Sequence, residues 1–197
     1  MQLQYKKFLL PIVIGIFSII VISGCNNNVS AEPATIESVA IKTITALKNK
    51  DLEQLSLITH PSQGVVFSPY GYINQDSSIT LSTDELSNLD LNQNFTWGTY
   101  DGIGTPINLS VQQYWEQFIY DRDYLMAPQV AQNQTLGTGN SLINIDTVFP
   151  TGTFIEYYFP GEDPQFEGMD WSSLRLVFDL YNNEWKLVGI IHDQWTI

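Results

Sequence analysis

The sequence predicts a single α+β domain, with helices near its start and an antiparallel sheet toward its end. With 197 residues, of which 44% are hydrophobic, the chain is long enough for one buried core and too short for two ordinary domains. Residues 35–49 place apolar side chains at helical spacing. Residues 174–195 form two extended apolar segments on either side of a pair of asparagines. This order, in which helices come first and a long hairpin comes last, is typical of α+β proteins.

The first 24 residues have the pattern of a secretory signal. Lys6 and Lys7 precede an apolar stretch at residues 8–22, which is short for a transmembrane helix. The stretch ends in "VISGC", whose last residue, Cys25, is the only cysteine. This segment resembles the lipobox of bacterial lipoproteins, and the resemblance implies that Cys25 is acylated and becomes the first residue of the mature chain. The alternative is a free cysteine at the end of a membrane anchor.

Residues 25–34 are polar and small, which predicts a flexible tether between the lipid and a domain at residues 35–197. Two acyl chains on Cys25 suffice for stable anchoring. We therefore expect the protein outside the cytoplasm, held by its lipid on the cell membrane or the outer membrane. Cleavage of the signal would remove Lys6 and Lys7 and leave 6 basic against 21 acidic residues in the mature chain. This balance argues against nucleic acid as a partner and against adhesion to anionic lipid.

Helix starts are marked by capping residues. Thr35 is placed to cap the first helix, and Asp51 a second, short one that Pro61 prevents from continuing. Two further helices are predicted from capping boxes, formed by Ser82 with Glu85 and by Ser110 with Gln113. Extended segments are expected at residues 64–73, 95–99 and 153–159, a loop at residues 129–141, and an acidic loop at residues 160–170.

The C-terminal hairpin has a register that its own turn fixes. Asn182 and Asn183 favour a two-residue type I′ turn. The turn predicts two sets of facing pairs, one on each side of the sheet: Leu180 with Trp185, Phe178 with Leu187 and Leu174 with Ile191, and on the other side Asp179 with Lys186 and Val177 with Val188. In a regular strand Asp193 and Trp195 then point inward and His192 outward, whereas a bulge at Gly189 would exchange them.

The order of elements, together with the closing run "WKLVGIIHDQW", resembles the nuclear transport factor 2-like cone fold. That resemblance implies a curved antiparallel sheet wrapped around the first helix, with a pocket at the open end. Members of that family include isomerases, dehydratases and binding modules. The phrases "GVVFSPYGY", "TWGTYDGIGTPI" and "GMDWSSLRLVF" also resemble an uncharacterised group of bacterial secreted proteins. Fold alone does not give a function.

Candidate site residues are few. The chain has no G-x-S-x-G, H-E-x-x-H, C-x-x-C or P-loop spacing. Asp193 is the main acid–base candidate, because a desolvated carboxylate in an aromatic pocket would have a raised pKa. His192 and His60 are weaker candidates. Four acids could suit Ca²⁺, but their spacing fails the EF-hand template, so we interpret them as a solvated loop and expect no metal and no cofactor: Glu162, Asp163, Glu167 and Asp170.

Two functions stay open at this point. The first is a non-catalytic, lipid-anchored domain that binds a small ligand, a peptide or a protein of the cell envelope. The alternative is an acid–base enzyme of isomerase, dehydratase or hydrolase type that uses the cone pocket. They differ in whether Asp193, His192 or His60 converges with a tyrosine inside a closed cavity. The chain has only two histidines and no recognisable catalytic constellation, which favours the binding function.

Overall fold

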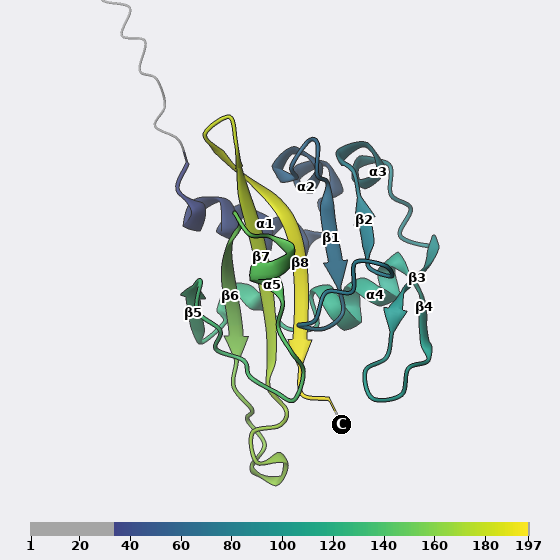
Figure 1. Ribbon diagram of the computed structural model, residues 1–197, viewed down its shortest axis with the longest axis vertical. Coiled ribbons are helices and arrows are strands. Elements are labelled where there is room, and N and C mark those ends of the chain that lie inside the picture. The colour runs from purple at the N-terminus through teal and green to yellow at the C-terminus, as the bar shows by residue number, and fades with distance from the viewer. Residues whose placement is uncertain (1–33, 197) are drawn as a thin grey trace, which may run out of the picture. The chain divides into compact units, whose positions relative to one another are not determined.

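The computed structural model describes residues 34–196, in which a curved sheet is covered on one face by α1 and α4 (Figure 1). The predicted signal, Cys25 and most of the predicted tether lie outside the described residues. The helices are α1 (Ile36–Asn49), α2 (Leu52–Ile58), α3 (Thr83–Ser87), α4 (Val111–Tyr114) and α5 (Ile145–Val148). Within residues 34–196, no helix has the length and apolar character needed to cross a bilayer.

The strands form two sheets. They are β1 (Val65–Ser68), β2 (Ile79–Leu81), β3 (Asn94–Thr99), β4 (Pro106–Ser110), β5 (Gln129–Gln132), β6 (Thr153–Phe159), β7 (Ser172–Tyr181) and β8 (Glu184–Gln194). The large sheet has the order β2-β1-β8-β7-β6-β5, and β3 pairs with β4 in a separate hairpin. The α+β class and the sheet against N-terminal helices are confirmed. One pairing is not antiparallel, because β1 runs parallel to β8. Most of the chain separates these two strands, so no tight turn dictates their direction.

The predicted helix starts are confirmed by their caps. The Thr35 side chain accepts a hydrogen bond from the Ser38 amide, and the Asp51 side chain accepts one from the Gln54 amide. Both capping boxes are formed, at the starts of α3 and α4. The chain continues from α4 into one π-helical turn at Trp115–Ile119. These local hydrogen bonds explain why the sequence alone located the starts of α1 to α4, whereas α5, which has no side-chain cap, was not predicted.

The main core lies between the helices and one face of the sheet. Ile44 and Leu47 of α1 belong to the same buried cluster as Phe118 and the β7 and β8 side chains Leu176 and Leu187. The Trp115 indole donates a hydrogen bond of 2.9 Å to the Leu47 carbonyl and fixes the π-helical turn on α1. A smaller cluster, which includes Ile145 of α5, covers the other face. Both faces of β7 and β8 are therefore buried.

The C-terminal hairpin follows the predicted register only near its turn. Asn182 and Asn183 have φ of 51° and 63°, as a type I′ turn requires. The predicted pairs from Leu180–Trp185 to Phe178–Leu187 are confirmed. Beyond them the register shifts, since Val177 pairs with Gly189 and Leu174 pairs with His192. The predicted pairs of Val177 with Val188 and of Leu174 with Ile191 are wrong, because Val188 is the extra residue of a bulge.

The bulge reverses the predicted orientation of the last residues. Leu187 and Ile190 pack in the main core, whereas Val188 and Ile191 pack in the smaller cluster on the other face. His192 therefore lies on the helix side and Asp193 on the opposite side. The exchange is the one that a bulge beside Gly189 was expected to produce. A second difference is at Gln129–Gln132, predicted as loop, which pairs with β6 as edge strand β5.

Candidate functional site

Asp193 forms part of a buried ionic cluster. Its Oδ2 lies 2.7 Å from Nη1 of Arg175, whose Nη2 lies 2.9 Å from Oε1 of Glu156. Arg175 and Glu156 are fully buried, and Asp193 is 3% exposed. Two carboxylates therefore share one guanidinium away from water. Removing any one of the three side chains would leave an unpaired buried charge.

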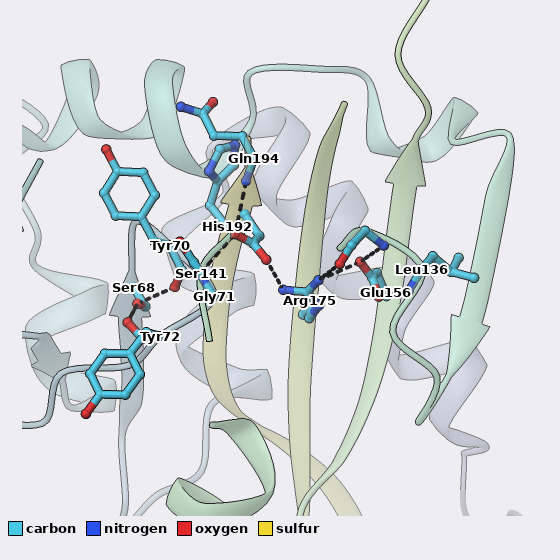
Figure 2. A network of polar contacts seen from close by, with 12 residues as sticks. Ser68, Tyr70, Gly71, Tyr72, Leu136, Ser141, Glu156, Arg175, His192 and Gln194 are labelled. Carbon is cyan, nitrogen blue, oxygen red and sulfur yellow. Dashed lines mark hydrogen bonds and ion pairs between the residues drawn. The ribbon is translucent and has the colours of Figure 1, made fainter. Parts of the chain in front are cut away.

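The ionic cluster also holds two loops against the sheet. The Gly71 amide donates to Asp193 Oδ1 at 3.2 Å, on the segment that follows β1. Glu156 accepts from the amides of Leu136 and Gly137 at 2.7 and 3.0 Å, and Arg175 donates to the Gly137 carbonyl at 2.9 Å. Figure 2 shows this row of contacts running from Gly71 across Arg175 to Glu156 and Leu136. The cluster therefore joins the loop after β1 to the loop before α5.

His192 belongs to a second cluster, on the helix face of the sheet. Its Nδ1 lies 3.2 Å from the Pro69 carbonyl oxygen, and its Nε2 lies 3.4 Å from Oδ2 of Asp121. The hydroxyls of Ser172 and Tyr124 also donate to Asp121, at 2.9 and 2.7 Å. Burial alone would raise the pKa of the Asp121 carboxyl, but these donors, with His192 foremost, lower it to about 2. The Asp121 carboxyl is therefore ionised at neutral pH and accepts these hydrogen bonds as a carboxylate.

Ser172, His192 and Asp121 are the residue types of a hydrolase triad, but their geometry is different. In a triad the carboxylate meets one imidazole nitrogen and the serine the other. Here Asp121 and Ser172 both lie near Nε2, while Nδ1 faces the Pro69 carbonyl. The Ser172 hydroxyl donates to the Asp121 carboxylate at 2.9 Å, closer than its 3.5 Å contact with the imidazole Nε2. The arrangement lacks an activated nucleophile.

The sequence-predicted acid–base residues do not converge. His192 and Asp193 lie on opposite faces of β8. His60 is 5% exposed at the other end of this strand, where its backbone amide donates to the Leu187 carbonyl. The His60 Nδ1 accepts hydrogen bonds from the amides of Ser62 and Gln63, so the ring is used in a local turn.

The acidic loop is organised by its own backbone. Asp170 Oδ2 accepts from the amides of Glu162 and Asp163, each at 3.0 Å. Asp163 in turn caps the 3₁₀ turn at Pro164–Phe166, and Glu167 ends that turn with φ of 51°. Among the described residues, no group of three or more His, Cys, Asp or Glu side chains is placed to hold a metal ion.

A cleft of about 710 Å³ lies next to both clusters, where three loops meet. It is formed by the segment after β1, the loop between β3 and β4, and the loop before α5. The lining is mostly aromatic, hydroxyl and amide side chains, among them Tyr70, Tyr72, Tyr100, Ser141 and Asn74. Figure 2 shows Tyr70 and Tyr72 on the side of Gly71 that faces away from Arg175. The ionic cluster therefore supports two walls of the cleft from behind.

Asp101 is the only charged side chain among the described residues that line the cleft. The hydroxyls of Thr196 and Ser141 donate to Asp101 Oδ2 at 2.6 and 2.8 Å, and these donors lower the pKa of its carboxyl. Burial raises the pKa of the neighbouring Tyr70 hydroxyl. At neutral pH the cleft therefore holds one carboxylate, Asp101, beside the protonated hydroxyl of Tyr70.

A separate apolar groove of about 360 Å³ lies beside the edge strand β5. Its lining includes Ile41 of α1, Val130 of β5 and Tyr157 of β6. The groove shares no lining residue with the cleft. It therefore provides an internal comparison for any binding measurement.

Sequence reasoning missed Arg175 and the residues that line the cleft. A charged residue between Leu174 and Leu176 in an apolar strand is a signal for a buried ion pair, since a lone charge is rarely buried. Its partners, Glu156 and Asp193, could not be named because the bulge decides which face Asp193 takes. The cleft comes from loops about 30 to 70 residues apart in the chain, and no local pattern joins them.

No family model matches this chain. Likewise, no curated protein matches it. Solved structures that resemble it include a putative calcium/calmodulin-dependent protein kinase II association domain from Xanthomonas campestris, with 11% identity over 81% of this chain and 84% of that one, at a TM-score of 0.35.

An NTF-2 like protein of unknown function from Shewanella oneidensis has 7% identity over 81% of this chain and 96% of that one, at a TM-score of 0.35. A protein of unknown function with a cystatin-like fold from Nostoc punctiforme has 9% identity over 82% of this chain and 76% of that one, also at 0.35. All three structures are similar to this chain only at low sequence identity.

Proposed function

We propose that this protein is a non-catalytic binding domain that takes an uncharged or cationic small ligand in the cleft beside β1. The observation that carries the proposal is the cleft lining, in which tyrosine rings and hydroxyls surround one carboxylate, Asp101. Binding sites of this kind combine apolar and aromatic surface with a few placed polar groups. The volume of about 710 Å³ lies within the range of small-molecule sites.

The charge of the cleft selects against anions. Among the described residues its lining contains no lysine, arginine or histidine, and the lowered pKa of Asp101 keeps this carboxylate ionised. The whole chain has a formal net charge of −13, which repels anions at a distance as well. Phosphates, nucleotides and carboxylic acids are therefore poor candidates.

The acid–base alternative has less support because its residues are occupied. Asp193 is paired with Arg175, and the His192 nitrogens face the Pro69 carbonyl and Asp121. A general base needs a free lone pair within reach of a substrate proton. Neither residue lines the cleft.

The proposal includes a membrane tether. The lipobox resemblance at Cys25 supports a diacyl anchor, and the polar residues 26–34 would hold the domain outside the cytoplasm. Anchoring places the cleft within reach of small molecules of the cell envelope or of an envelope protein. The lipid anchor is proposed for the cell membrane or the outer membrane, and fractionation of the cells shows which of the two carries the protein.

A binding panel tests the proposed function. The purified full-length protein, in a polyoxyethylene detergent, is titrated with neutral, cationic and anionic small molecules, and binding is followed by calorimetry. Tyr72, which is 52% exposed on the cleft, is replaced by Ala, and the control is Phe166→Ala, a 47% exposed aromatic in the acidic loop.

We expect neutral or cationic compounds to bind, with affinity lost in Tyr72→Ala and kept in Phe166→Ala. Binding of anions only, or equal affinity in both variants, would contradict the proposal. Turnover of a compound that Asp193→Asn abolishes, while the fold is kept, would favour the acid–base enzyme instead.

A further inference from the structure

We propose that the ligand of the cleft is a neutral oligosaccharide of at least two sugar units. This inference rests on the proposed function, because it names the ligand class of the same cleft. Three features of the lining carry it: fixed tyrosine rings, hydroxyls without a partner in the described structure, and a carboxylate already surrounded by neutral donors. Each feature matches one part of a sugar.

Two of the tyrosine rings of the cleft are held by packing and offer flat apolar surface. Tyr70 packs edge-on against Phe118 with ring centroids 5.8 Å apart, and Tyr100 packs against the same ring at 6.4 Å. Tyr72 presents a half-exposed ring on the same cleft. The C–H face of a pyranose is apolar and flat, so it can stack on such rings while its hydroxyls point sideways.

The hydroxyls around these rings are available for a ligand. Tyr72, Tyr100, Ser77, Ser78 and Thr99 all line the cleft, and no hydroxyl among them has a hydrogen-bond partner within the described residues. A hydroxyl both donates and accepts. A surface with several free hydroxyls is therefore complementary to a ligand that also carries many hydroxyls.

Asp101 fits a sugar better than it fits an ammonium ion. Its Oδ2 accepts from two hydroxyls and its Oδ1 accepts from the Gly102 amide, so neutral donors already solvate the charge. Further neutral donors, such as sugar hydroxyls, can complete this set by charge-assisted hydrogen bonds. Quaternary ammonium ligands are instead recognised by several aromatic rings around one point.

The size and openness of the cleft favour more than one sugar unit. Its volume of about 710 Å³ lies in the upper part of the range for small-molecule sites. Ile103 and Leu142 line it and are each 77% exposed, so one side of the cleft opens to solvent. A chain of sugars can extend through such an opening.

An array of oligosaccharides tests the inference. The full-length protein, in a polyoxyethylene detergent that contains no sugar, is applied to neutral and N-acetylated glycans of two to six units. The best ligand is then measured by calorimetry at low and high salt against choline as the cationic probe. The variants are Tyr72→Ala and Thr99→Val, with Phe166→Ala as control, and thermal unfolding confirms that each is folded.

We expect a neutral glycan to bind with an affinity that salt leaves unchanged, and that falls at least tenfold in Tyr72→Ala and several-fold in Thr99→Val. Binding of choline but no glycan, weakened by salt, would overturn the sugar inference and leave the binding function standing. If no compound of the panel binds and the cleft variants behave like the control, both proposals fail.

Discussion

Replacing Arg175 by Met removes the guanidinium that separates two buried carboxylates. The side chain is fully buried and donates to Glu156, Asp193 and the Gly137 carbonyl at 2.7 to 2.9 Å. Methionine fills a similar volume but leaves two negative charges unpaired. Breaking a buried ion pair from one side costs about 3 to 5 kcal/mol. We expect the free energy of unfolding to fall by that amount, toward the upper end because two partners lose their counter-charge.

The assay is urea unfolding of the full-length chain followed by tryptophan fluorescence, at neutral pH. The matched control is Lys48→Met, which breaks the ion pair with Asp123, whose two side chains are 42% and 43% exposed. That loss should stay below about 1 kcal/mol. A triple variant that also carries Glu156→Gln and Asp193→Asn should be more stable than Arg175→Met alone, because no unpaired charge remains. A loss below about 1 kcal/mol in Arg175→Met, or no recovery in the triple variant, would show that Arg175 does not neutralise two buried charges.

Three further predictions follow from the sequence and the fold. Leu187→Ala should cost about 2 to 5 kcal/mol because this side chain is fully buried, whereas Lys186→Ala should cost well under 1, and equal small losses in chemical unfolding would contradict the register. Cys25→Ser should leave the protein unprocessed or release it from the membrane fraction, and a variant that still partitions into detergent like the parent would disprove the lipobox. Asp121→Asn should cost about 2 kcal/mol at neutral pH, because a pKa lowered from 3.8 to about 2 stabilises the fold above pH 4. This stabilisation is lost as the pH falls from about 4 to 2, so the difference from the parent should narrow over that range; a constant difference would show that the charge of Asp121 contributes nothing.

Local chemistry explains what the sequence could predict. Thr35 and Asp51 cap helices through hydrogen bonds to residues three positions away, and Asn182 with Asn183 forms a turn from its own backbone preference. Such features need no information from the rest of the chain. The strand pairs nearest the turn were predicted correctly for the same reason.

Tertiary contacts explain the features that the sequence could not predict. A Cβ on Gly189 would lie 3.2 Å from two atoms of the Phe149 ring, so a residue 40 positions earlier packs directly over the bulge. The side of the sheet on which Asp193 lies depends on that bulge, and no local pattern of sequence places the Phe149 ring beside it. The cleft likewise depends on Gly71 and Gly137 being held by one buried cluster, which no single segment of sequence contains.

Fluorine NMR of the full-length chain with fluorinated tyrosines, titrated with the ligand that binds best, shows whether this ligand occupies the cleft. The signals are assigned by single Tyr→Phe variants. We expect the signals of Tyr72 and Tyr100 in the cleft to shift with the ligand, and the signal of Tyr157 in the groove beside β5 to stay unchanged. A shift of Tyr157 with unchanged signals from the cleft tyrosines would contradict binding in the cleft.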